Sequence, residues 1–159
     1  MTRPILTIED MSIVFSSPDE ADIEAVRQVD LTLTPGKTLA LVGESGCGKS
    51  VTARAILRLL DANAKIPHGK ILFEPAGEAV TDIAQLKQDS LPLRAIRGNQ
   101  IAMIFQEPMS SLSPVHTVGD QIDEMMTIHE GLSGKQARER TVALLDQVGI
   151  PGPRERASA

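Results

Sequence analysis

The stretch from Gly43 to Ser50 carries residue types that can hold a polyphosphate. It reads GESGCGKS, which satisfies the pattern of one glycine, four free positions and then Gly-Lys-Ser or Gly-Lys-Thr. A loop that wraps a phosphate must aim its backbone N–H groups inward, and glycine permits the required conformations because it has no Cβ. Lys49 would contact the β- and γ-phosphates as a point charge, and the Ser50 hydroxyl would ligate Mg²⁺. The sequence therefore predicts a site for a nucleoside triphosphate and its magnesium ion.

The segments on both sides of this loop have the composition that such a site needs. TLALVG at 38–43 is a continuous apolar run, which is typical of a buried parallel strand. From Lys49 to Leu60 the apolar residues fall on one stripe, which predicts a helix. The first N–H groups of that helix and the positive end of its dipole would face the phosphate. Strand, loop and helix follow one another in the order that the motif requires.

Alternation of apolar and polar residues predicts two strands before the loop. It indicates extended structure from Ile5 to Phe15 and again over VDLTLT at 29–34. The acidic, turn-rich segment 16–22 separates these two stretches, and TPGK at 34–37 predicts a turn after the second. We therefore expect the two strands to pair antiparallel.

The chain after the loop predicts two further strands and then two helices. GKILFE at 69–74 and QIAMIF at 100–105 have the composition of short strands, whereas 74–90 is polar and predicts an exposed, irregular segment. Helical spacing of apolar residues extends from Thr117 to Glu130 and from Ser133 to Val148. The order β, then β/α, then α predicts an α/β fold with an antiparallel appendage and a helical tail.

The composition of the 159 residues excludes several other kinds of site. Three Phe, no Tyr, no Trp and a net charge of −5 predict an aliphatic core and no nucleic-acid partner. The single cysteine, Cys47, cannot form an internal disulfide, and the first residues do not have the pattern of a signal peptide or a membrane span. His68, His116 and His129 lack the spacing of metal ligands. Cys47 is interpreted as a tolerated small residue whose thiol would make the site sensitive to alkylating reagents.

Two longer stretches resemble the ATP-binding subunits of ABC transporters, and within that family the peptide importers. They are LALVGESGCGKSVTARAILRLL and GNQIAMIFQEPMSSLSPVHTVGDQI, and the resemblance extends from Ile5 to Ile150. It implies an α/β P-loop NTPase fold of the ABC ATPase type, with an N-terminal antiparallel β subdomain and the start of a helical subdomain. The implied division of residues 1–159 is an antiparallel β part at 1–37, a P-loop core at 38–106 and the helical part at 107–159.

The resemblance also implies roles for individual residues. The Phe15 ring would stack on adenine, although a core position in a strand is the alternative interpretation. Gln106 would contact Mg²⁺ and the attacking water, and so would act with Lys49 in catalysis; a solvated glutamine at a strand end is the alternative. The implied metal ligands are Ser50 and Gln106. The implied ATP contacts are Phe15, Gly43, Glu44, Ser45, Gly46, Cys47, Gly48, Lys49, Ser50, Val51 and Thr52.

The remaining catalytic motifs of that family are not identified in this sequence. LSGKQ at 132–136 and VALLDQ at 142–147 resemble a signature and a Walker B strand. Ser133 follows Gln106 too closely, however, and too few residues separate it from Asp146 for an intervening helix and strand. We interpret the region as one amphipathic helix with Ser133 as its N-cap. The sequence is thus expected to be a truncated ABC domain that binds ATP weakly, hydrolyses it negligibly and has low stability or self-associates through open apolar edges.

The implied function is to couple ATP binding and hydrolysis to peptide uptake. The implied partners are transmembrane permease subunits and a second ATP-binding subunit, at the inner face of the cell membrane. Two alternatives stay open: a nucleotide-binding module without catalysis, and a small-molecule kinase. Against the kinase, antiparallel strands precede the loop, and Arg94 and Arg97 are not marked as a lid over phosphates.

Overall fold

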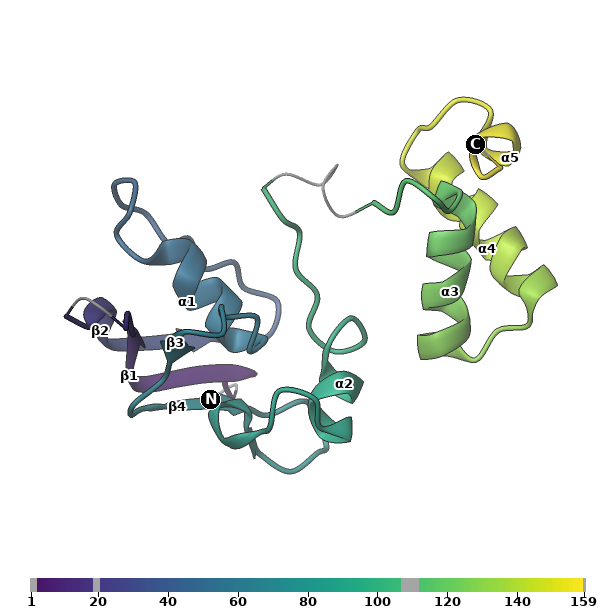
Figure 1. The fold of residues 1–159 in the computed structure, drawn as a ribbon. Helices are drawn as coiled ribbons and strands as arrows, with labels where there is room; N and C mark the ends of the chain where they lie inside the picture. Colours follow the sequence, from purple (N-terminus) through teal and green to yellow (C-terminus); the bar gives the residue numbers. More distant parts are fainter. Residues whose placement is uncertain (1–2, 19–20, 107–111, 159) are drawn as a thin grey trace. The chain divides into compact units, whose positions relative to one another are not determined.

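The computed structural model describes residues 3–18, 21–106 and 112–158 (Figure 1). By internal contacts the chain divides into two compact units, residues 1–94 and 95–159, and each is described here by itself. This division does not test the predicted three-part organisation, which stays a prediction.

The described strands of the first unit form an antiparallel sheet. β1 is its central strand, with β2 on one side and β4 on the other, and β5 extends the sheet beyond β4. β1 and β2 pair antiparallel from Leu6 opposite Leu33 to Phe15 opposite Ile23, which confirms the predicted pair, although β2 begins at Ile23 and not at residue 29 as predicted. The strands are β1 (Leu6–Phe15), β2 (Ile23–Leu33), β3 (Ala64–Lys65), β4 (Lys70–Phe73) and β5 (Thr81–Asp82).

The core of this unit is mainly aliphatic, as the scarcity of aromatic residues predicts, and it also contains Phe73 of β4. Ile8, Met11 and Ile13 of β1 are fully buried, together with Ile71 of β4. Ile83 is also fully buried, in the short 3₁₀ helix η1 (Ile83–Gln85) that follows β5. The expectation that 74–90 is only exposed and irregular is therefore wrong, because the side chain of Ile83 fixes η1 on the core.

Helix α1 (Lys49–Ile56) follows the glycine-rich loop, as predicted, and lies against one face of the sheet (Figure 1). Its buried residues are Thr52 and Ala55. It ends before Leu60, the predicted end, because the chain turns through Arg58, whose φ of 54° is left-handed.

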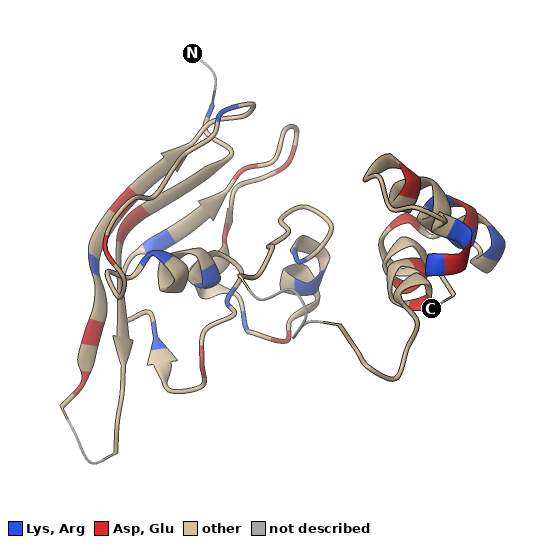
Figure 2. Ribbon diagram, turned by 90° about the horizontal axis from the view of Figure 1, so that it is seen from above, with Lys and Arg blue, Asp and Glu red and all other residues tan. Residues whose placement is uncertain are grey.

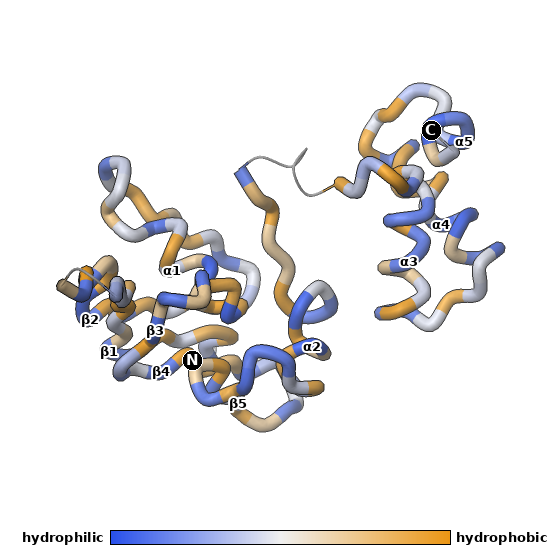
Figure 3. The backbone as a smooth tube through the Cα atoms, viewed as in Figure 1, coloured by the Kyte–Doolittle hydropathy of each residue, from blue (hydrophilic) through white to orange (hydrophobic). Residues whose placement is uncertain are grey.

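The two apolar runs predicted as buried parallel strands, 38–43 and 100–105, are not strands in this structure. Val42 is 92% exposed and Ile104 is 95% exposed, and Ile101 forms only an isolated bridge with Arg97. Figure 3 shows the hydrophobic colouring of the stretch that follows α2 (Leu91–Ile96). A parallel strand needs hydrogen-bonded neighbours, and no strand among the described residues pairs with either run.

Two antiparallel helices dominate the second unit. They are α3 (Val118–Glu130) and α4 (Gly134–Gln147), followed by the short α5 (Pro153–Arg156). Thr117 accepts a hydrogen bond from the Asp120 N–H at the start of α3, and Ser133 forms a capping box with Gln136 at the start of α4. Both predicted helices are confirmed, with starts and ends within a residue of the predicted ones.

A cluster of polar side chains joins α3 to α4. The guanidinium of Arg138 lies 2.7 Å from Asp120 and 2.9 Å from Asp123, and it donates to the Ala157 carbonyl at 2.9 Å. The buried Thr141 hydroxyl donates to Asp123. Figure 2 shows charges of both signs on these helices. Hydrogen bonds from Thr117 and Arg138 lower the pKa of Asp120 below its ordinary value of 3.8.

We predict that Thr141→Val lowers the free energy of unfolding by about 1.5–2 kcal/mol, because it removes a buried donor to a carboxylate while keeping the side-chain shape. Urea denaturation followed by far-UV circular dichroism measures the loss. Thr127→Val is the matched control, since this exposed hydroxyl bonds only within α3, and should change stability by less than about 0.5 kcal/mol. Equal losses would show that Thr141 does not hold the helices together.

The lowered pKa of Asp120 predicts a pH dependence of known sign. A carboxyl group with a lower pKa in the folded state stabilises the fold above its unfolded pKa, and this contribution fades as the pH falls through the folded value. The urea midpoint of the wild type should exceed that of Asp120→Asn above about pH 5, and the difference should shrink below about pH 4. A difference that is constant with pH would contradict the ionised interaction with Arg138 and Thr117.

Candidate functional site

The glycine-rich loop reaches α1 through a turn that depends on β2 behind it. Gly48 has a φ of 91° and is the N-cap of α1. A Cβ on Gly48 would lie 2.8 Å from the Ala25 carbonyl oxygen and 3.1 Å from a Val26 methyl group. Both the backbone conformation and the lack of space therefore require glycine at this position.

The N-terminus of α1 is open to an anion. Among the described residues no side chain caps the helix, and its first turn contains no acidic residue. The first N–H groups of a helix lack intrahelical acceptors, and together they carry a partial positive charge. The residues present thus fit a phosphate group, which would accept hydrogen bonds from these donors.

The Lys49 ammonium lies within the loop. Its Nζ donates to the Gly43 carbonyl at 2.8 Å and to the Glu44 carbonyl at 2.6 Å, and lies 3.4 Å from Cys47 Sγ. The positive charge is therefore held against the loop backbone beside the open N–H groups of α1. A phosphate that enters the loop can replace these neutral acceptors with charged ones, which form stronger hydrogen bonds with an ammonium group.

A cavity of about 480 Å³ lies beside the loop, between β2 and the start of α1. Cys47, Gly48, Lys49 and Thr52 line it on one side, and residues 25–27 of β2 on another. The sequence predicted these four loop and helix residues but not the wall formed by Ala25 and Val26. Ala25 and Val26 are adjacent apolar residues before the alternating stretch at 29–34, so no local spacing in the sequence marks this wall.

The other predicted site residues do not line this cavity. Glu44, Ser45, Gly46 and Ser50 are exposed in the loop and the first turn of α1, and Val51 follows them on the helix. Their contacts with a nucleotide stay predictions.

Phe15 and Gln106 lie apart from the loop along the chain. Phe15 is half-buried at the end of β1, where it pairs with Ile23 and Ala64. Gln106 is exposed, and it belongs to the second unit. The adenine contact of Phe15 and the metal contact of Gln106 stay predictions.

The two stretches that resemble later motifs belong to α4 and its cap, as interpreted from the sequence. Residues 134–136 form the first turn of α4, and 142–147 form its last turns. Ala137 and Thr141 are buried at helical spacing. Within the described residues, no group of three His, Cys, Asp or Glu side chains could hold a metal ion.

A comparison with known families decides the classification. Residues 26–158 match the model of the family described as ABC transporter. The chain belongs to the ABC transporter family. The predicted fold class, a P-loop NTPase of the ABC type with an antiparallel β part, is therefore confirmed, and the kinase alternative is removed. In the part of this ABC transporter chain that the structure describes, no helix has both the length and the apolar character to cross a membrane.

Relatives of this ABC transporter chain are ATP-binding proteins of bacterial transport systems. A peptide import ATP-binding protein of Brucella abortus is 47% identical over 156 residues, which are 98% of this chain and 45% of that protein. A peptidoglycan transport ATP-binding protein of Agrobacterium fabrum is 47% identical over 99% of this chain and 28% of its own length. A glutathione import ATP-binding protein of Salmonella typhimurium is 43% identical over 94% and 24%. The chain thus spans less than half the length of these relatives.

The close approach of β2 to the loop predicts unequal costs for two glycine substitutions. Gly36→Ala should cost about 1 kcal/mol of unfolding free energy, because it adds only left-handed backbone strain at an open position. Gly48→Ala adds an overlap with the Ala25 carbonyl and should cost about 2–4 kcal/mol. Urea denaturation compares the two variants, and equal costs would mean that β2 does not support the loop.

Proposed function

We propose that this chain is the nucleotide-binding region of an ATP-binding subunit in an ABC importer for peptides. The observation that carries the proposal is the loop itself: a lysine ammonium held beside the uncapped N-terminus of a helix, in a chain of the ABC transporter family. The names of its relatives, which refer to import of peptides and glutathione and to transport of peptidoglycan, support the class of substrate.

The proposed nucleotide is ATP with Mg²⁺. The N–H groups of the loop and of the first turn of α1 bind the phosphates, and Lys49 exchanges its carbonyl acceptors for β- and γ-phosphate oxygens. Ser50 and Gln106 hold the magnesium ion, which neutralises charge on the phosphates. Phe15 contacts the adenine ring.

The proposed partners are transmembrane permease subunits and a second ATP-binding subunit, with the protein bound peripherally to the inner face of the cell membrane. ATP binding between the two ATP-binding subunits drives closure, which the permease subunits convert into uptake. We propose that the 159-residue chain by itself binds ATP but hydrolyses it negligibly, because the stretches that resemble a signature and a Walker B strand are parts of a helix and its cap.

Titration with a fluorescent ATP analogue and Mg²⁺ tests this function. Lys49→Ala should weaken binding at least about tenfold, because it removes a charge-assisted hydrogen bond to phosphate. Lys37→Ala is the matched control: it removes the same charge from an exposed turn before the loop and should leave the affinity unchanged.

Absence of nucleotide binding in the wild type, or equal affinity in the two variants, would refute the proposal. Phosphate release measured on the same samples tests the second part. Turnover that disappears in Lys49→Ala would show that the chain hydrolyses ATP after all.

A further inference from the structure

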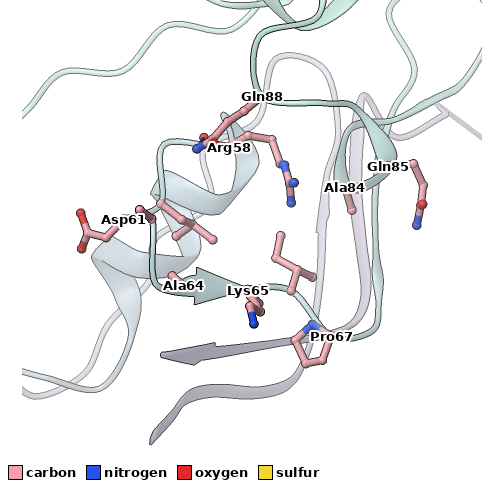
Figure 4. Close-up of a pocket in the computed structure, with 11 residues that line it drawn as sticks. Arg58, Asp61, Ala64, Lys65, Pro67, Ala84, Gln85 and Gln88 are labelled. Carbon is pink, nitrogen blue, oxygen red and sulfur yellow. Dashed lines mark hydrogen bonds between the residues drawn. The ribbon is translucent and has the colours of Figure 1, made fainter. Parts of the chain in front are cut away.

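The two ends of α1 differ in how closely the rest of the first unit packs against them. At the C-terminal end a cavity of about 530 Å³ lies between the turn after the helix, β3 and η1 (Figure 4). At the N-terminal end, by contrast, a Cβ on Gly48 would lie 2.8 Å from the Ala25 carbonyl oxygen. The part of β2 around Ala25 therefore gives close backbone support where the glycine-rich loop enters the helix.

This part of β2 is irregular. Between two regular pairs, Ser12 of β1 lies opposite two residues of β2, Arg27 and Gln28. Gln28 has a left-handed φ of 46°. A further shift in register falls at Ala25, which has no partner on β1. Two residues opposite one form a β-bulge, which bends the longer strand and increases its twist.

The bulge is held by the hydroxyl of Ser12. This serine is fully buried in β1, and its Oγ accepts a hydrogen bond from the Gln28 N–H at 2.9 Å. Because a bulged residue loses its place in the ladder of backbone hydrogen bonds, the hydroxyl takes the place of the backbone acceptor that a regular strand would supply. Without it, the Gln28 N–H would lose this acceptor in a part-buried position, which is costly.

The bulge also lies beside the candidate site. Residues 25–27 and 29, which surround it, line the cavity of about 480 Å³ next to the glycine-rich loop. The Ala25 carbonyl and a Val26 methyl group are the parts of β2 that meet Gly48. Since a bulge redirects the backbone of its strand, the bend at 25–28 determines where these groups lie.

We infer that Ser12 is a positioning residue for the nucleotide site. It holds the bulge at Gln28, and the bulge places the β2 backbone that supports Gly48 and the start of α1. The inference rests on the proposed function for its ligand, and it extends that function by giving a buried residue outside the loop an effect on nucleotide affinity.

The same pair of strands contains a matched control. Asp10 of β1 also has a left-handed φ, of 44°, at a register shift, and its N–H donates to the Asp30 carboxylate at 2.8 Å. Neither Asp10 nor Asp30 lines the cavity beside the loop. Loss of the Asp30 carboxylate therefore disturbs a bulge of the same kind that does not border the candidate site.

Ser12→Ala and Asp30→Ala compare the two bulges. Ser12→Ala should weaken binding of the fluorescent ATP analogue with Mg²⁺ about fivefold, because displaced N–H donors form poorer hydrogen bonds to phosphate. Asp30→Ala should stay within about twofold of the wild type. Both affinities are measured without denaturant on chains that far-UV circular dichroism shows to be folded, so a loss of stability alone does not change them.

Deletion of Gln28 is a second variant, and it decides the question if Ser12→Ala does not fold. The deletion removes the extra residue together with its N–H, so that Ser12 faces Arg27 alone as in a regular pair. Affinity for the analogue should fall at least about fivefold. Adding Ser12→Ala to the deletion should cause no further loss, because the hydroxyl acts through the bulge.

Amide signals of the ¹⁵N-labelled chain without nucleotide give a separate measurement. Those of Gly48 and Lys49 should shift in Ser12→Ala and stay in place in Asp30→Ala. Ser12 is not a positioning residue if these signals do not move, if folded Ser12→Ala binds the analogue like the wild type, if Asp30→Ala loses as much affinity, or if the deletion leaves the affinity unchanged. A wild type that binds no nucleotide would refute the proposed function, whereas the amide signals would still test the support of the loop by Ser12.

Discussion

The position of the glycine-rich loop depends on one close contact, between Gly48 and the backbone of β2. The space there is too small for a Cβ, since the Ala25 carbonyl oxygen would lie 2.8 Å away. β2 is fixed in turn by its long antiparallel register with β1, whose inward side chains fill the core. The buried strand pair therefore sets where α1 begins, and α1 sets where its first N–H groups and the Lys49 ammonium would meet the proposed phosphate.

Features that neighbouring residues determine could be predicted from the sequence. The loop, the β1–β2 pair and the helices α3 and α4 each carry their own signals: glycine spacing, alternation, and capping residues such as Ser133 with Gln136. Hydrogen bonds within a few residues are enough to form a helix. The same locality explains why the helix from Ser133 to Val148 could be predicted, because its capping residues and the helical spacing of Ala137 and Thr141 lie within the segment itself.

Features that depend on distant partners could not be predicted in this way. The apolar runs at 38–43 and 100–105 have strand composition, but a strand exists only where another strand accepts and donates its backbone hydrogen bonds. The burial of Ile83 was not predicted for a related reason: Val80, Ile83 and Leu86 are all apolar, and the sequence alone does not show which of them meets the core. In the site, the Ala25–Val26 wall follows from the tertiary contact of β2 with the loop, which no local spacing encodes.

The two ends of α1 satisfy their backbone groups in opposite ways. At the C-terminus the Schellman bonds to Arg54 and Ala55 use carbonyls that the helix leaves unpaired. At the N-terminus no side chain among the described residues performs the equivalent role for the N–H groups. A short helix gains little stability from its own propensity, and in the part of the first unit that the structure describes the N–H groups at this end are left for solvent or a ligand to satisfy. A phosphate bound as proposed would accept hydrogen bonds from these N–H groups and would thereby stabilise the start of the helix.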